Sequence, residues 1–166
     1  MREIKRVVHE AMDAGMMGWS CQRFGKNSMQ ADYDGTPMPT DVMPDETLLA
    51  LADVLAERGE GFIEMINATT GEPLKTNDPK DSKFVEEIAR RSGRPVLYNA
   101  IIAMDAPGYE TAHHAALKWL DDCFADGKRI YGQAVTVRAA YQFTLEHWNL
   151  YDSSPAWNEL TQGSIA

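Results

Sequence analysis

The sequence predicts an α/β fold with about four parallel strands flanked by helices. Helical and extended segments alternate strictly along the 166 residues, and each helical segment ends close to a glycine. The extended segments are nearly continuous runs of apolar residues. Strict alternation implies parallel strands joined by right-handed crossovers, and continuous apolar strands are typical of a sheet that is covered on both faces.

The first helix and strand are followed by a long loop. Apolar residues at helical spacing predict a helix over residues 4–12, and Gly15 is placed to end it. Residues 16–20 follow as a short buried strand. Residues 21–43 are rich in glycine, asparagine, aspartate and proline and show no apolar period, which indicates a loop. Long loops in compact domains are often functional.

Three further helix–strand pairs complete the pattern. The Pro-Asp-Glu run at residues 44–46 marks a helix start, and Asp81 is the predicted N-cap of the next helix. In the last helix, Leu117, Leu120 and Phe124 are expected to face the core. The predicted segments are helices over residues 45–58, 81–92 and 110–126, and strands over residues 61–66, 95–102 and 129–137.

Four such units are half of an eight-stranded barrel, which usually needs about 250 residues. Residues 1–140 carry the alternation and form the predicted partial barrel, whereas residues 141–166 are predicted to be an aromatic-rich tail or loop extension. Two folds remain open on this pattern alone. One is a complete flavodoxin-like open sheet, and the other is part of a barrel whose remaining half is other polypeptide.

Charge and composition exclude several classes of partner. The formal net charge is -9 and the pI about 4.8, so binding to nucleic acid or to an anionic membrane is not expected. No apolar run approaches the roughly 20 residues of a membrane helix. Cys21 and Cys123 form no metal spacing and no disulfide framework, which favours reduced thiols in a cytoplasmic protein.

Five segments, in order, resemble the N-acyl-D-amino-acid deacylases (D-aminoacylases) of the amidohydrolase superfamily. Each resembles a successive unit or loop of that family, and together they cover nearly the whole chain. The segments are HEAMDAGMMGWSCQRFG (residues 9–25), DETLLALADVLAERGEGFIEMI (45–66), EEIARRSGRPVLYNAII (86–102), ADGKRIYGQAVTVRA (125–139) and SSPAWNEL (153–160).

The resemblance implies strands four to seven of a (β/α)8 TIM-type barrel, so that the chain is a partial barrel. It implies metal-assisted hydrolysis of amide C–N bonds, with zinc lowering the pKa of bound water. It also implies that the family's His-x-His pair on strand one and its aspartate on strand eight lie outside this chain. The remaining barrel half, or a partner subunit, would have to supply them.

Two further zinc-ligand positions of the family do not carry histidine here. The resemblance places the strand-five ligand near Glu64 or Met65, and the strand-six ligand near Asn99, Ala100 or Ile101. Zinc is therefore implied by the family while its ligands are not present in this chain, and no metal-binding residue is predicted. The catalytic residues are unknown for the same reason.

Polar residues at or after the carboxyl ends of the strands are the candidate substrate-binding groups, because that face of a barrel carries the βα loops. A polar group in an apolar strand is costly unless paired, so these residues are either satisfied structural groups or groups that line a pocket. Arg23 and Arg138 fit bidentate binding of a substrate carboxylate; the alternative for each is a solvated loop arginine. The candidates are Ser20, Gln22, Arg23, Glu64, Asn67, Asn99, Gln133 and Arg138.

The histidines and cysteines offer weaker candidates. His113 and His114 are adjacent and point about 100° apart on a helix, so they cannot share one metal there. His9 is expected to be structural on the first helix, and His147 lies in the tail. Ser20-Cys21 resembles a nucleophile site only weakly.

Three functions follow from this reading. The first is a segment of an amidohydrolase that acts on N-acyl-D-amino acids or similar small amides and is inactive alone. The second is a non-catalytic α/β subunit or binding module that associates with a complementary barrel half. The third is a self-contained flavodoxin-like domain, for which no phosphate-binding loop follows the first strand.

Overall fold

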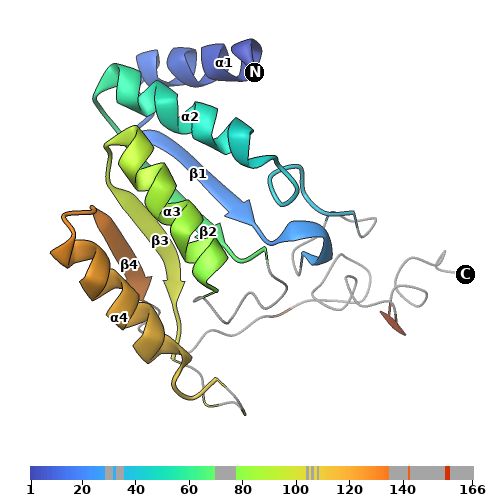
Figure 1. The fold of residues 1–166 in the computed structure, drawn as a ribbon. Coiled ribbons are helices and arrows are strands. Elements are labelled where there is room, and N and C mark those ends of the chain that lie inside the picture. Colours follow the sequence, from blue (N-terminus) through green and yellow to red (C-terminus); the bar gives the residue numbers. More distant parts are fainter. Residues whose placement is uncertain are drawn as a thin grey trace, which may run out of the picture.

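A computed structural model describes residues 1–28, 32, 36–69, 78–103, 105, 107, 109–134, 142, 156 and 157. Within these residues, helices and strands alternate as the sequence predicts (Figure 1). The elements are α1 (Arg2–Asp13), β1 (Gly18–Arg23), the short 3-10 helix η1 (Gly25–Asn27), α2 (Asp45–Arg58), β2 (Phe62–Asn67), α3 (Pro79–Ser92), β3 (Val96–Ile101), α4 (Ala112–Ala125) and β4 (Ile130–Ala134).

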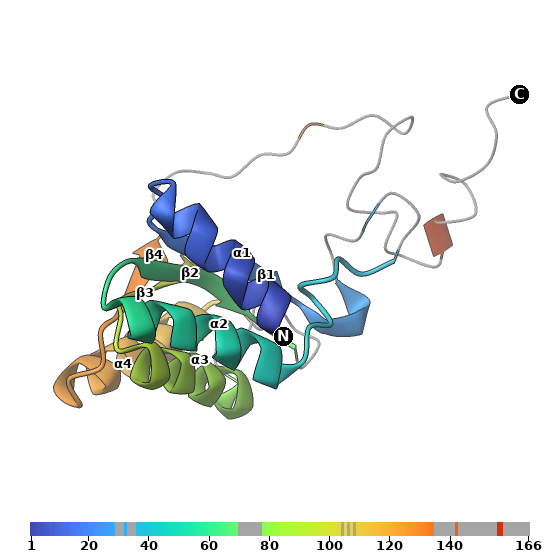
Figure 2. The ribbon, with the colours of Figure 1, turned by 90° about the horizontal axis from the view of Figure 1, so that it is seen from above.

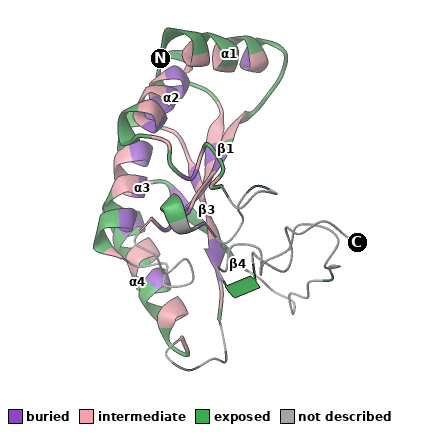
Figure 3. Ribbon diagram, turned by 90° about the vertical axis from the view of Figure 1, so that its right-hand side faces the viewer, coloured by how far each residue is buried: buried purple, intermediate pink, exposed green. Residues whose placement is uncertain are grey.

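The strands form one parallel sheet in the order β1-β2-β3-β4. This confirms the predicted parallel α/β arrangement with flanking helices. Helices α2, α3 and α4 lie on one side of the sheet, in the same order as the strands, and α1 lies across the sheet edge at β1 (Figures 1 and 3). A flavodoxin-like sheet instead has the order 2-1-3-4-5 and helices on both faces, so the described strand order differs from that alternative.

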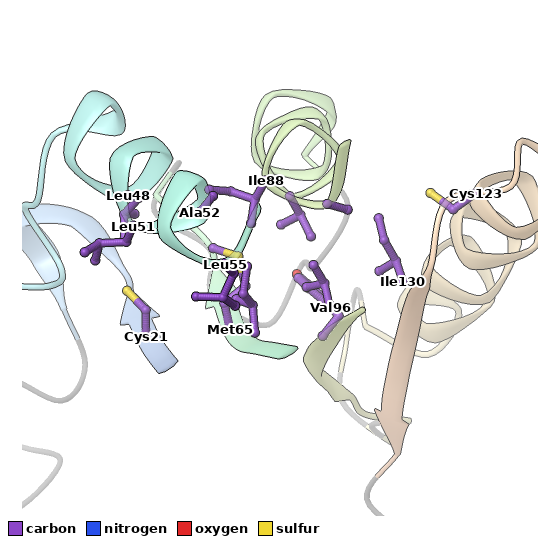
Figure 4. Packing of buried hydrophobic residues seen from close by; sticks show 14 of the residues in the cluster. Cys21, Leu48, Leu51, Ala52, Leu55, Met65, Ile88, Val96, Cys123 and Ile130 are labelled. Carbon is purple, nitrogen blue, oxygen red and sulfur yellow. The ribbon is translucent and has the colours of Figure 1, made fainter. Parts of the chain in front are cut away.

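The core lies between the sheet and the helices. Alternate residues of β2 are buried on this side, among them Ile63 and Met65. They pack with Leu55 of α2 and Ile88 of α3, and the same layer continues to Ile130 at the start of β4 (Figure 4).

The opposite face of the sheet is more open. Four of the five β4 residues are exposed, and Glu64 of β2 is only half-buried. The expectation of a sheet covered on both faces is therefore wrong for the part of the chain that is described. Figure 2, from above, shows α2, α3 and α4 gathered to one side of the strands, with α1 at the β1 edge.

Two predicted element boundaries are wrong. β1 covers Gly18–Arg23 rather than residues 16–20, so Gln22 and Arg23 belong to the strand and not to the loop. The N-cap of α3 is Asp78, whose carboxylate accepts the Lys80 backbone N–H at 2.8 Å. Asp81 is instead buried inside the first turn of α3, where other residues occupy its carboxylate.

The predicted core face of α4 is also partly wrong. Ala116 and Cys123 are the buried residues of this helix, and Leu120 packs against the core as expected. Leu117 and Phe124 are exposed instead, because they lie on a different side of the helix from Ala116 and Cys123. Residues 135–137 of the predicted last strand, Arg138, and the tail apart from residues 142, 156 and 157 lie outside the described residues.

Candidate functional site

The carboxyl ends of β1 and β2 lie side by side. Arg23 and Asn67 are the last residues of these two strands and are partners in the parallel register. In parallel α/β proteins this edge carries the loops that bind ligands. The candidate site is therefore built from these two residues and from the loops and helix starts that meet them.

Arg23 is held by three neighbours. Its guanidinium forms an ion pair with Asp45, at the start of α2, and donates through Nη1 to Asn67 Oδ1 at 3.4 Å. The guanidinium carbon lies 4.7 Å from the centre of the Phe84 ring of α3, in a cation–π contact. The side chain is only 12% exposed, so the alternative of a solvated loop arginine is wrong. Its Nε has no hydrogen-bond partner within the described residues.

Asn67 ties the end of β2 to the first turn of α3. Its Nδ2 donates to the backbone oxygen of Asp81 at 3.2 Å and to Asp81 Oδ1 at 3.0 Å. Thr69 Oγ1 donates to the same carboxylate oxygen at 2.7 Å. Since both ends of the Asn67 amide are bonded, its polar group is satisfied by the fold itself.

Asp41 is a buried carboxylate that the sequence analysis did not single out. Its oxygens accept the backbone N–H of Phe24 at 2.8 Å, the backbone N–H of Met38 at 3.2 Å, and Nε2 of Gln22 at 3.3 Å. Only 1% of Asp41 is exposed. It therefore fixes the segment around residue 41 to the end of β1. The preceding residues 37–40, Pro-Met-Pro-Thr, indicate an ordered turn. This turn is the local feature of the sequence that could have pointed to Asp41.

The other predicted residues lie on the opposite, open face of the sheet. Side chains alternate along a strand, so Ser20, Glu64, Asn99 and Gln133 point away from the face that carries Tyr98 and Asn67. Ser20 is paired with Glu64, and Asn99 with Gln133, in neighbouring strands. The Gln22 side chain also leaves the strand on this face, and its amide then donates to Asp41.

The predicted site residues thus divide into two groups. Arg23 and Asn67 form one hydrogen-bonded cluster at the carboxyl edge, on the helix side. Ser20, Glu64, Asn99 and Gln133 form two short rows on the open face, with Gln22 at its border. Arg138 lies outside the described residues.

The described donors do not fit the zinc site that the family resemblance implies. Among the described residues, no three or more histidine, cysteine, aspartate and glutamate side chains are grouped as a metal site would require. Met65, Ala100 and Ile101 are buried apolar residues, which leaves Glu64 and Asn99 as the possible oxygen ligands among the five predicted positions. His9 instead contacts Glu57 at 3.2 Å, and the His113 and His114 rings contact each other at 4.1 Å between centres.

Cys21 is not placed as a nucleophile. It is 7% exposed and faces the helices, and burial raises the pKa of its thiol to about 11. Burial likewise raises the pKa of Cys123 to about 11. Reactive cysteines are exposed and have a lowered pKa, so the weak resemblance of Ser20-Cys21 to a nucleophile site has no support in this geometry.

We expect both thiols to resist labelling in the folded protein. A thiol with a pKa of about 11 is ionised in roughly one molecule in a thousand at about pH 8. Only the deprotonated thiol reacts, so labelling should be slow. Labelling with a chromogenic disulfide reagent should release less than about a tenth of the colour before urea is added. Full release from the native protein would contradict the burial of both side chains.

No protein-family model matches this sequence, and no curated protein or solved structure matches it either. The functional argument therefore rests on the residues of this chain. Within the described part of the chain, every helix is too short or too polar to cross a lipid bilayer.

Proposed function

We propose that the chain is a segment of an amidohydrolase-type (β/α)8 barrel, which hydrolyses C–N bonds of N-acyl-D-amino acids or similar small amides once other polypeptide completes it. The observation that carries the proposal is the run of four consecutive parallel strands with α2, α3 and α4 on one face and α1 at the β1 edge. In a (β/α)8 barrel the helices form an outer ring and the other face of the sheet lines the interior. The order of the family-like segments along the chain supports the same assignment.

The polar rows on the open face are suited to an amide substrate. Asn99 and Gln133 each present both a donor and an acceptor, as an amide does, and Glu64 adds an acceptor beside Ser20. These residues would bind and orient the substrate from inside the barrel. Because Arg23 is engaged by Asp45 and Asn67 on the helix side, we assign it a positioning role at the carboxyl edge.

Among the described residues we find no set of side chains suited to the metal chemistry of the family. At the two ligand positions that the resemblance implies, Met65, Ala100 and Ile101 are buried apolar residues, and no histidine stands at either position. Hydrolysis would require ligands from the completing polypeptide. The two free cysteines and the acidic surface fit a cytoplasmic place of action.

A second candidate is a non-catalytic subunit or binding module that associates with a complementary barrel half. Exposed Leu117 and Phe124 on α4, next to the exposed strand β4, favour association. This candidate shares the partial-barrel geometry and differs only in having no chemical step.

Enzyme assays separate the two candidates. We expect the isolated chain to bind less than stoichiometric zinc and to release no amino acid from N-acetyl-D-amino acids. Co-expression with polypeptide that supplies strands one to three and strand eight of an N-acyl-D-amino-acid deacylase should yield hydrolysis, which Glu64→Gln and Asn99→Ala lower at least about tenfold. The matched control is Glu46→Gln, an exposed carboxylate on α2, which should leave the rate unchanged.

One outcome would decide against the amidohydrolase proposal, and another against the need for a completing polypeptide. A co-expressed complex that forms but never hydrolyses any N-acyl amino acid would leave the binding-module candidate. Stoichiometric zinc and hydrolysis by the isolated chain would show that its own residues hold the metal.

A further inference from the structure

The row of helices has two ends, and both ends present exposed apolar side chains. α1 stands at one end of the row and α4 at the other (Figures 1 and 3). Val7 of α1 is 50% exposed, and Leu117 and Phe124 of α4 are 49% and 77% exposed. Large apolar side chains at this exposure, gathered on one helix side, are typical of a contact surface.

On α4 these residues lie on the side away from α3. Trp119 points to α3, because its Nε1 donates to Glu86 Oε1 at 2.9 Å. Ala116 and Cys123 point to the core. At 100° per residue, Leu117 and Phe124 lie roughly 140° to 160° around the helix from Trp119. They therefore face the place where the next helix of the row would stand.

On α1 the exposed apolar residue lies on the side away from α2. Lys5 Nζ and His9 Nε2 both reach the Glu57 carboxylate of α2, at 2.7 and 3.2 Å. Val7 lies between them in sequence and so points roughly to the opposite side of the helix. Met17, which precedes β1, is 70% exposed at the same end of the row.

The exposed apolar residues of α1 and α4 also lie at matching positions along the two helices. Leu117 is the sixth residue of Ala112–Ala125, as Val7 is the sixth residue of Arg2–Asp13. Phe124 lies near the end of α4, and Met17 lies just after the end of α1. Neighbouring helices of a barrel run in the same direction, so Leu117 would meet Val7 and Phe124 would meet Met17.

The sheet has matching edges as well. In the described residues, β1 pairs only with β2 and β4 only with β3. Tyr131 of β4 is 50% exposed beside this edge. An unpaired strand edge with apolar neighbours favours pairing with another chain. Two sets of four parallel strands give the eight strands of a closed barrel.

We propose that the isolated chain forms a two-fold dimer in which a second copy occupies both ends of the row. β4 of each copy pairs in parallel with β1 of the other, and Leu117 and Phe124 pack against Val7 and Met17 of the second copy. The two-fold axis repeats the same contact twice and closes the ring, so the assembly stops at two chains. This rests on the barrel geometry of the proposed function and not on its amide chemistry.

Association is tested by measuring molar mass with light scattering after size exclusion. The expected value is twice the 18.5 kDa of one chain. Phe124→Asp should weaken the dimer at least about thirtyfold, because a buried apolar contact is replaced by a desolvated charge. Ala125→Asp is the matched control, since it adds the same charge at the next, exposed position and should leave the dimer intact. A monomeric wild type, or open-ended oligomers, would overturn the inference.

A cross-linking experiment does not depend on the aspartate variants folding. Val7→Cys combined with Leu117→Cys should give a covalent dimer on mild oxidation, whereas Val7→Cys with Lys118→Cys should not. A failed cross-link in both pairs would contradict the arrangement. The co-expression assay of the proposed function uses a different barrel half, so its result is independent of whether the chain pairs with itself.

Discussion

Replacing Asp41 by alanine is expected to lower the free energy of unfolding by about 2–4 kcal/mol. The carboxylate is buried and accepts from the Phe24 and Met38 backbone N–H groups and from the Gln22 amide. Alanine leaves these donors without their acceptor in a site closed to water. Urea unfolding followed by circular dichroism measures the change.

The size of this effect is checked against a matched acid on the surface. Asp121→Ala removes an exposed carboxylate from α4 and should change the free energy of unfolding by less than about 0.5 kcal/mol. Asp41→Asn keeps an acceptor oxygen and should fall between the two. If Asp41→Ala is no more destabilising than Asp121→Ala, the segment around residue 41 is not fixed to β1 by this carboxylate.

The alternation of helices and strands was predictable because it depends on the sequence pattern within each segment. Each helix carries apolar residues at helical spacing, and Gly59 and Gly93 end α2 and α3 in the left-handed conformation that favours glycine. The parallel order of the strands follows from the same alternation. Local sequence is sufficient here because neighbouring units of the chain are also neighbours in space.

The errors lie where a distant residue decides the local structure. The carboxyl half of β1 contains Gln22 and Arg23, which look like loop residues until Asp41 and Asp45 are seen to satisfy them. Asp81 has the residue type of an N-cap, yet its carboxylate is taken by Asn67 and Thr69 of the neighbouring strand end. Periodicity along one segment carries no information about such partners.

The same limit applies to the candidate site. The sequence placed these residues at strand ends without pairing them, and the register of the parallel sheet puts Arg23 beside Asn67 and Asn99 beside Gln133. Strand-end position did not predict which face each residue takes or that Asp45 and Phe84 hold Arg23. α4 was misjudged because its apolar residues cover more than one side, and periodicity does not say which side meets the core.

Gly18→Ala is expected to lower the free energy of unfolding by about 3–5 kcal/mol. Gly18 begins β1 with a φ of +139°, and a Cβ there would lie 1.9 Å from the backbone oxygen of its register partner Phe62. Since the obstacle is backbone, it cannot move aside as a flexible side chain can, and the start of β1 must separate from β2.

Gly93→Ala provides the comparison with a glycine that has no close neighbour. Gly93 also has a positive φ, +60°, but a Cβ there would meet nothing within 4 Å, so alanine should cost only about 1–2 kcal/mol. Equal losses for the two variants, measured by urea unfolding, would mean that conformational strain alone accounts for Gly18. We expect a larger loss for Gly18→Ala, because the close Phe62 backbone oxygen and the φ of +139° both oppose a Cβ there. Because Arg23 and Asn67 are partners in the same two strands, amide exchange in Gly18→Ala should also quicken at their carboxyl edge.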